Sequence, residues 1–308
     1  MRVILSRKGF DSEYGGKPSP IIKSKDGSWR YYSLPIPSMK SNKTESGLIP
    51  SDIKYSDVKL FDDFKVSDFL KDVLPKRTDL NFCHLDPDIR ESSLPNRPFE
   101  WKRNFGQVKA AQSHLENNKI GIGDVFLFFG WFQFAEYQNG KFNFIKSSDY
   151  PNGFHANYSY LQINEVFKPN IEKVPSWLDY HPHVKFKNEP EFNNPNNTIY
   201  VAKELFDCQD QLNKKGSILF TFNENLILTK KGQNNRTLWE LPINFHPDKG
   251  VRLSYNPTHK WTASEGRCFL KSAFKGQEFV FNDVDEIVEK WCIQLIKMNQ
   301  VADNQPLS

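Results

Sequence analysis

The residues with the clearest chemical potential lie near the start of the chain. A short apolar run, Val3-Ile4-Leu5, is followed by Ser6-Arg7-Lys8-Gly9-Phe10-Asp11 and then by Gly15-Gly16-Lys17-Pro18. This segment places a hydroxyl, two cations and a carboxylate around backbone that glycine leaves open. We predict that Ser6, Arg7 and Lys8 bind a polar or anionic substrate and that Asp11 is a catalytic carboxylate. A solvated loop has the same composition, and no GxxxxGK[ST] or GxGxxG motif names the ligand.

The second group with chemical potential is His84-x-Asp86. A histidine and a carboxylate two residues apart on an extended segment face the same side of the backbone. Asp86 can then fix the tautomer of His84 for general base catalysis, so both are predicted as catalytic residues. Metal binding by this pair would need a third ligand. The sequence does not identify one, and we assign no metal ligand from it.

A third group is His181-Pro182-His183, where the proline stiffens the backbone. In an extended segment both imidazoles would face one side, where they could bind a phosphate or a metal, or pass a proton. We include His181 and His183 among the catalytic candidates. Exposed or capping histidines in a loop remain the alternative. His155 is a weaker candidate for substrate binding.

The elements that must position these groups are mostly strands. The continuous apolar run 125–132 predicts a central strand buried on both faces, and Asn139-Gly140 predicts a hairpin turn. Residues 158–167 alternate like a half-buried strand. Helical spacing of apolar residues predicts three helices, at 67–74, 106–117 and 284–298. We expect residues 38–51 to form an exposed loop.

We therefore predict an α+β fold over a single domain, residues 1–300, with a frayed tail at 301–308. Its sheet is mixed and mostly antiparallel, with peripheral helices and a C-terminal helix. A Gly-Asp turn at 123–124, an apolar strand that ends in Phe-Gly, and the later strand Leu161-Gln162-Ile163 resemble the small barrels of the PUA, ASCH and EVE type. That resemblance implies a sheet curled into a barrel that holds a base or RNA.

Composition excludes several classes of protein. The net charge of +4 is compatible with nucleotide or nucleic-acid binding but lacks the dense cationic stripe of a non-specific DNA binder. The four cysteines are far apart, with no CxxC pair, which argues against a zinc ribbon or a disulfide framework. No GxSxG motif is present, so covalent hydrolase chemistry is disfavoured. Without a signal peptide or a long apolar run, we expect a cytoplasmic protein without membrane partners.

Several motifs recur in one order along nearly the whole chain: Ser6-Arg7-Lys8-Gly9-Phe10-Asp11, His84-Leu85-Asp86, Phe105-Gly106-Gln107, Gln112 to Leu115, Gly123 to Trp131, His181-Pro182-His183, Asn197 to Tyr200, and Gln277-Glu278. This order resembles the nucleotide modification associated domain 3 family, which is defined by proposed links to DNA base modification in bacteria and phages. The resemblance implies a nucleotide or nucleic-acid partner but no particular reaction.

Our leading hypothesis is an enzyme, such as a group transferase, that acts on a nucleobase or nucleotide. Arg7 and Lys8 would hold a phosphate, while Gln112, Asn197 and Tyr200 would hydrogen-bond a base edge. Two alternatives stay open. One is a non-enzymatic reader that grips a modified base in an aromatic pocket, with Trp131 as a stacking ring. The other is a metal-dependent phosphohydrolase or nuclease, which needs three ligands to meet. The sequence identifies no cofactor and no protein partner.

Overall fold

The computed structural model of the chain describes residues 1–39, 49–77, 79–208, 213–273, 277–283 and 285–299. Within them the fold is α+β with a predominance of strands, as predicted. The described residues contain four α-helices: α1 (Val66–Val73), α2 (Lys109–Asn117), α3 (Pro182–Lys185) and α4 (Ile287–Asn299). Most of the loop predicted at 38–51 and the tail predicted at 301–308 lie outside the described residues.

The central sheet is mixed and mostly antiparallel. Its main path runs β16-β19-β1-β10-β12-β13-β9, and β2, β3, β11 and β14 attach beside it. Parallel pairing joins β1 to β10 and β10 to β2, and the other pairings in this sheet are antiparallel. The strands are β1 (Val3–Arg7), β2 (Ser19–Lys23), β3 (Trp29–Tyr31), β9 (Asn104–Gln107), β10 (Val125–Gln138), β11 (Lys141–Phe144), β12 (Phe154–Phe167), β13 (Thr198–Ala202), β14 (Ser217–Leu219), β16 (Arg252–Leu253) and β19 (Glu278–Asn282).

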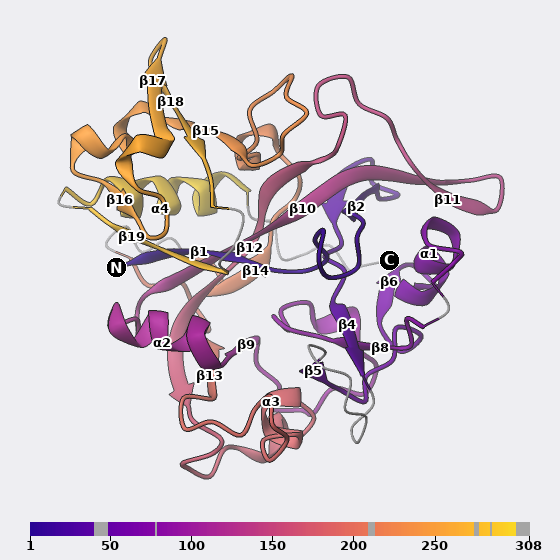
Figure 1. Cartoon of the computed structure of the whole chain (residues 1–308). Helices are drawn as coiled ribbons and strands as arrows, with labels where there is room; N and C mark the ends of the chain where they lie inside the picture. The colour runs from indigo at the N-terminus through magenta and orange to yellow at the C-terminus, as the bar shows by residue number, and fades with distance from the viewer. Residues whose placement is uncertain (40–48, 78, 209–212, 274–276, 284, 300–308) are drawn as a thin grey trace.

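The predicted barrel is not confirmed. Among the described residues no pairing joins the two ends of the main path, β16 and β9, so the sheet stays open there. Figure 1 shows β1, β10 and β12 side by side through the middle of the molecule, with α4 near β19 and α1 near β11. We describe the fold as an open, mixed sheet with helices around it.

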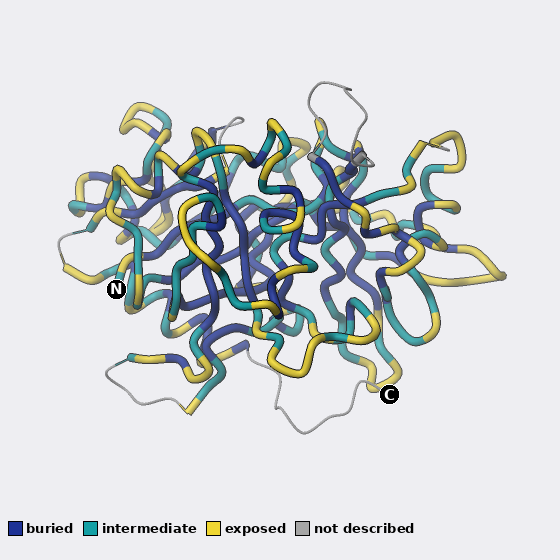
Figure 2. The backbone as a smooth tube through the Cα atoms, turned by 90° about the horizontal axis from the view of Figure 1, so that it is seen from below, coloured by how far each residue is buried: buried dark blue, intermediate teal, exposed yellow. Residues whose placement is uncertain are grey.

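Strand β10 forms where the apolar run predicted it. Phe126, Phe128 and Phe129 are fully buried, and the strand becomes exposed only near its far end. It continues beyond the predicted end into the hairpin with β11, where Asn139 and Gly140 both have positive φ, as a tight hairpin turn requires. Figure 2 shows the result as buried backbone through the centre of the molecule and exposed loops around it.

Three smaller sheets flank the central one. Strands β15 (Leu238–Pro242), β18 (Arg267–Lys271) and β17 (Trp261–Ser264) form one of them, and β5 (Ile49–Pro50), β4 (Ile36–Met39) and β8 (Phe82–His84) form another. A two-stranded sheet joins β6 (Lys59–Phe61) to β7 (Phe64–Lys65). Strand β8 ends at His84, one of the predicted catalytic residues.

The helices differ from prediction mainly at their ends. Helix α4 begins at Ile287, three residues later than predicted, and Glu286 directly before it has a non-helical, positive φ. The Asp283 carboxylate accepts a hydrogen bond from the backbone N–H of Val288 (2.8 Å) in the first turn. Helix α2 begins at Lys109, since Gly106 and Gln107 belong to β9. No helix among the described residues combines the length and apolar character needed to cross a membrane.

The prediction of an extended segment at His181-Pro182-His183 was wrong. Pro182 opens the short helix α3, and His181 is its N-cap residue. Proline is favoured in the first helical position because its φ suits a helix and its missing N–H would have no partner there. The two imidazoles therefore meet through a helical turn and not through strand alternation.

Candidate functional site

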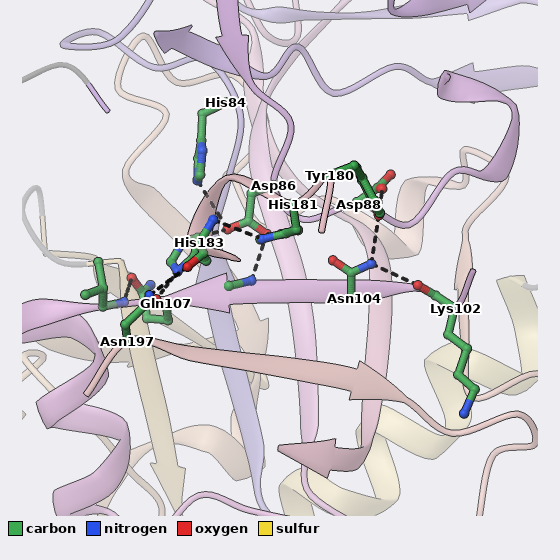
Figure 3. A network of polar contacts seen from close by, with 12 residues as sticks. His84, Asp86, Asp88, Lys102, Asn104, Gln107, Tyr180, His181, His183 and Asn197 are labelled. Carbon is green, nitrogen blue, oxygen red and sulfur yellow. Dashed lines mark hydrogen bonds and ion pairs between the residues drawn. The ribbon is translucent and has the colours of Figure 1, made fainter. Parts of the chain in front are cut away.

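Four side chains that the sequence singled out meet in one place. His84 ends β8, Asp86 follows two residues later, His181 caps α3, and His183 lies inside α3. The Nε2 atoms of His84 and His183 lie 3.4 and 3.7 Å from Asp86 Oδ2, and His181 Nε2 lies 3.8 Å from Asp86 Oδ1. Figure 3 shows the three rings pointing at the carboxylate. We call these four residues the histidine–aspartate cluster.

The cluster is buried. The side chains of His84 and Asp86 are 6 and 4 % exposed, and those of His181 and His183 are 0 and 3 % exposed. Burial opposes ionisation of Asp86, but the contacts with His181 and His84 outweigh it and hold the pKa of the carboxyl well below its usual range. The same burial lowers the pKa of His183 well below its usual value, against the attraction of Asp86. The cluster therefore contains an anionic carboxylate and a neutral His183.

The protons on two of the rings can be assigned from their partners. Asn197 donates from Nδ2 to the His183 backbone carbonyl and to Asn170 Oδ1, both at 2.8 Å, which fixes the orientation of its amide. Asn197 Oδ1 therefore accepts from His183 Nδ1 (2.6 Å), and the lone pair of His183 Nε2 faces Asp86. His181 Nδ1 accepts from the backbone N–H of His183 (3.3 Å), so its proton is on Nε2.

Strand β9 forms the floor of the cluster. The N–H of Gly106 donates to Asp86 Oδ1 (2.9 Å). A Cβ atom at Gly106 would lie 2.6 Å from His183 Cδ2 and 2.7 Å from His183 Nε2, closer than real Cβ contacts. The absence of a side chain at this position lets the imidazole rest against the strand. Gly106 therefore has both a hydrogen-bonding and a steric role in the cluster.

Three cations form a second group, which we call the cationic wall: Arg7, Lys8 and Arg236. Arg7 donates from Nη2 to the Ala273 carbonyl (2.8 Å) and lies 5.7 and 5.6 Å from the ring centroids of Phe129 and Phe279. Burial lowers the pKa of Arg7, while Asp11 raises it and Arg236 lowers it.

The other two cations have different surroundings. Lys8 pairs with Glu278 at 2.8 Å in a nearly buried ion pair and lies 4.2 Å from the Phe105 ring centroid. Arg236 lies 4.0 Å from the Trp131 ring centroid and donates to the hydroxyl of Ser12. Glu278 therefore neutralises Lys8, and the two guanidinium groups of Arg7 and Arg236 complete the cationic wall.

Asp11 shapes the loop beside the cationic wall. Its Oδ1 accepts hydrogen bonds from the backbone N–H groups of Glu13 and Tyr14, at 2.8 and 2.7 Å. This is the ordinary way in which aspartate closes a turn on its own backbone. Burial lowers the pKa of Arg236 as it does that of Arg7, and the Asp11 carboxylate lies near enough to oppose both shifts. The structure thus gives Asp11 a positioning role that its residue type alone did not indicate.

One cavity of about 330 Å³ connects the two groups. The three residues of the cationic wall line it on one side. His84, Asp86 and His183 of the cluster also line it, as do His155 and Asp11. Its remaining lining residues are Gly9, Ser12, Glu13, Tyr14, Ile36, Gly106, Gln107, Val108, Thr237 and Gln277. A volume of this size lies in the range of small-molecule sites. The loop after β1 and the histidine–aspartate cluster, far apart in sequence, are therefore two sides of one site.

His155 is a buried member of the cavity lining. Its Nδ1 accepts from the indole N–H of Trp239 (3.1 Å), and its ring is 5.5 Å from that of Phe129. Burial lowers the pKa of His155 well below the usual value, and Arg7 and Arg236 add to this effect. His155 is accordingly neutral, and it borders the cationic wall as a polar, uncharged group.

Five predicted substrate-binding residues do not line this cavity. Tyr200 donates from its hydroxyl to Gln112 Oε1 (3.0 Å), and both side chains are buried in the core. Ser6 is fully buried on β1. The indole N–H of Trp131 donates to the Asn152 carbonyl (2.8 Å). Because these side chains are occupied or enclosed elsewhere, we leave them out of the site. Asn197 does not line the cavity, and it hydrogen-bonds to His183 as described above.

Sequence reasoning missed Arg236, Gln107 and Gly106 as members of the site. Arg236 follows two asparagines in a polar turn, which has no local signature of binding. Gln107 donates to Glu278 Oε1 (2.7 Å), so it supports the partner of Lys8. Gly106 and Gln107 were visible only as part of a family motif. Their roles depend on what the fold places opposite them.

The aromatic residues of β10 have a structural role. Phe128, Phe129 and Phe132 are fully buried in the main hydrophobic cluster. Among the described residues that line the cavity, the histidines carry imidazole rings and Tyr14 carries a phenol ring. The cavity lining therefore combines three cations (Arg7, Lys8 and Arg236) with three carboxylates (Asp11, Glu13 and Asp86) and histidines, and it is not an aromatic cage.

The comparison with protein families agrees with the resemblance seen in the order of the sequence motifs. A search of curated proteins and a search of solved structures each return no match to the chain. The model of one family, described as nucleotide modification associated domain 3, matches residues 2–282. That range includes every residue of the cationic wall and of the histidine–aspartate cluster. The chain therefore belongs to the nucleotide modification associated domain 3 family.

Proposed function

We propose that the protein is an enzyme that modifies a nucleotide or nucleobase within the cavity described above. The observation that carries this proposal is that one cavity is lined both by Arg7 and Arg236 and by His84, Asp86 and His183. Arginine is well suited to bind a phosphate through charge-assisted hydrogen bonds. The family description supports a nucleotide as the substrate class.

In this proposal the substrate lies across the cavity. Its phosphate is bound by Arg7 and Arg236, and Asp11 keeps the loop in place through the N–H groups of Glu13 and Tyr14. The group to be modified faces the histidine–aspartate cluster, where imidazole and carboxylate are suited to activate a hydroxyl or an amine. We assign the reaction to transfer of a group from a small-molecule donor to a hydroxyl or amine of a nucleotide, either free or within DNA. The bond from the group to the donor breaks as the new bond forms, and the cluster accepts the proton of the hydroxyl or amine.

The alternative of a non-enzymatic reader has less support. A reader would need stacking rings around the base, whereas the described lining has few rings and several titratable groups. A metal-dependent phosphohydrolase is a second candidate, because His84, Asp86 and His183 meet as that chemistry requires. The two enzymatic readings differ in product: group transfer increases the mass of the nucleotide, and hydrolysis removes phosphate.

Binding and product analysis test the proposal. We expect nucleotides to bind the full chain and Arg236→Gln to weaken that binding by about tenfold or more, because a charge-assisted contact is lost. Arg77→Gln is the matched control, since Arg77 is exposed, pairs with Asp79 and does not line the cavity. Calorimetry with nucleoside mono-, di- and triphosphates and with single-stranded DNA measures these affinities.

The chemical step is tested by mass spectrometry of nucleotides and DNA incubated with the protein and a small-molecule extract. We expect a new nucleotide mass that is lost in His84→Gln while nucleotide binding remains. Tight binding with no new mass would favour the reader. Binding that is absent, or equal in Arg236→Gln and Arg77→Gln, would overturn the assignment of the cationic wall.

A further inference from the structure

We infer that His84, Asp86 and His183 form a binding site for one divalent transition-metal ion. One nitrogen or oxygen atom of each lies within 4.8 Å of the others. Ligands around a tetrahedral ion are about 3.3–3.6 Å apart for bonds of about 2.0–2.2 Å. The separation of 3.4 Å between His84 Nε2 and Asp86 Oδ2 lies in this range, and that of 3.7 Å between His183 Nε2 and Asp86 Oδ2 is slightly longer. The ring centroids of His84 and His183 are 5.6 Å apart, so both imidazoles can bind the same ion.

The charge of the cluster argues for a cation. Asp86 is nearly buried, and its ion-pair partners among the described residues are three histidines, with no lysine or arginine. Burying a carboxylate is costly in free energy unless it is paired with a cation or coordinates a metal. A divalent ion bound between the rings and the carboxylate would remove that cost.

The surrounding hydrogen bonds suit metal ligation. Asn197 Oδ1 accepts a hydrogen bond from the Nδ1–H group of His183. The Nε2 atom of His183 therefore has its lone pair free to bind an ion. Metal-bound histidines commonly have such a partner on the other ring nitrogen. The N–H of Gly106 holds the second oxygen of Asp86 at 2.9 Å, so Oδ2 can face the ion. His181 carries its proton on Nε2, toward Asp86 Oδ1, and is a positioning residue and not a ligand.

The donor set indicates the class of metal. Two imidazoles and one carboxylate favour first-row divalent ions such as Zn²⁺ or Fe²⁺, whereas Mg²⁺ and Ca²⁺ prefer oxygen ligands. Three protein ligands leave at least one position for water or a substrate oxygen. All three ligands line the cavity, so that position faces the proposed substrate. A catalytic role for the ion rests on the proposed function, but binding of the ion can be measured without any substrate.

Metal titration of the full chain tests the site. After dialysis against a chelator, we expect about one equivalent of Zn²⁺ per chain by calorimetry, and visible absorption from Co²⁺ in the same site. His84→Gln, Asp86→Asn and His183→Gln should each abolish this binding. Asn197→Ala should weaken it on the order of 10–100-fold while stoichiometry is kept. His155→Gln is the matched control, because His155 is a buried histidine of the same cavity outside the ligand set.

The outcomes separate this site from the proposed function. Absence of saturable Zn²⁺ and Co²⁺ binding, retained binding in all three ligand variants, or loss in His155→Gln would overturn the site. Tighter binding of Mg²⁺ than of Zn²⁺ would overturn its assignment to transition metals. If a ligand variant does not fold, X-ray absorption of the Co²⁺-loaded wild-type protein decides, and fewer than two imidazole ligands would reject the site. Metal binding without any nucleotide product would leave the site standing and reject the enzyme.

Discussion

At the scale of single residues, the site depends on which charges are already paired. Lys8 and Arg7 are neighbours in the sequence, yet their partners differ. Lys8 is held by Glu278 beneath the cavity, whereas Arg7 lies between aromatic rings and the Ala273 carbonyl. The residue types predicted two equivalent phosphate-binding cations. The fold instead gives Lys8 a mainly structural role, and in our proposal Arg7 and Arg236 bind the substrate.

The Lys8–Glu278 pair makes a prediction about stability. Both side chains are nearly buried, at 8 and 1 % exposure, and Gln107 donates to the same carboxylate oxygen as Lys8. Lys8→Met would leave a buried carboxylate without its cation, so we expect the free energy of unfolding to fall by about 3–5 kcal/mol. Urea denaturation followed by circular dichroism measures the change.

The double variant is the control for this pair. Lys8→Met combined with Glu278→Gln removes both charges, so most of the lost stability should return. A single Lys8→Met variant with stability within about 1 kcal/mol of the wild type would show that the pair behaves like an exposed one.

At the scale of elements, the histidine–aspartate cluster is assembled by β8, α3 and β9. The sequence could predict His84-x-Asp86 because the two residues are close together in the chain. It also identified His181 and His183, but from an extended geometry that Pro182 prevents. Their convergence on Asp86 could not be predicted, since it depends on how α3 packs against β9. The prediction of Gln112 and Tyr200 as substrate-binding residues failed because an amide and a phenol can hydrogen-bond to each other within the core as well as to a ligand.

Strand β9 provides a test of this packing. A methyl group at Gly106 would lie 2.6 Å from His183 Cδ2, so Gly106→Ala should push the imidazole away from Asp86. A displacement of about 1 Å at a reacting group can reduce a rate by about 100-fold. We expect a loss of that order in nucleotide modification, together with weaker Zn²⁺ binding, measured by mass spectrometry and calorimetry.

Gly121→Ala is the matched glycine control, because a Cβ atom there would meet nothing within 4 Å. It should behave like the wild-type protein in both measurements. If Gly106→Ala and Gly121→Ala gave the same affinity and the same rate, close packing of His183 on β9 would have no functional effect.

At the scale of the whole molecule, the buried neutral His155 makes the free energy of unfolding depend on pH in the acid range. Burial, Arg7 and Arg236 lower the pKa of His155 well below 6.5. Below about pH 6.5 the unfolded chain takes up a proton that folded His155 does not, so stability is complete above that pH and decreases as the pH falls. The slope for one such group approaches about 1.4 kcal/mol per pH unit.

The variant His155→Gln isolates this contribution. Its side chain can still accept from Trp239 but does not titrate, so its stability should depend less steeply on pH between about 5 and 6.5. Urea denaturation of both proteins across about pH 5–8 measures the two slopes. Parallel slopes would mean that His155 is protonated equally in the folded and unfolded chains.

The pairing of β1 between β10 and β19 also has a consequence for how the protein is made. β1 contains the first part of the site, yet one of its two neighbours begins at Glu278. The partner of Lys8 is that same residue, and Gln277 borders the cavity. A ribosome therefore makes the loop after β1 well before it makes the strand that completes the surroundings of that loop. Until β19 has been made, the loop has its charges but not its pocket.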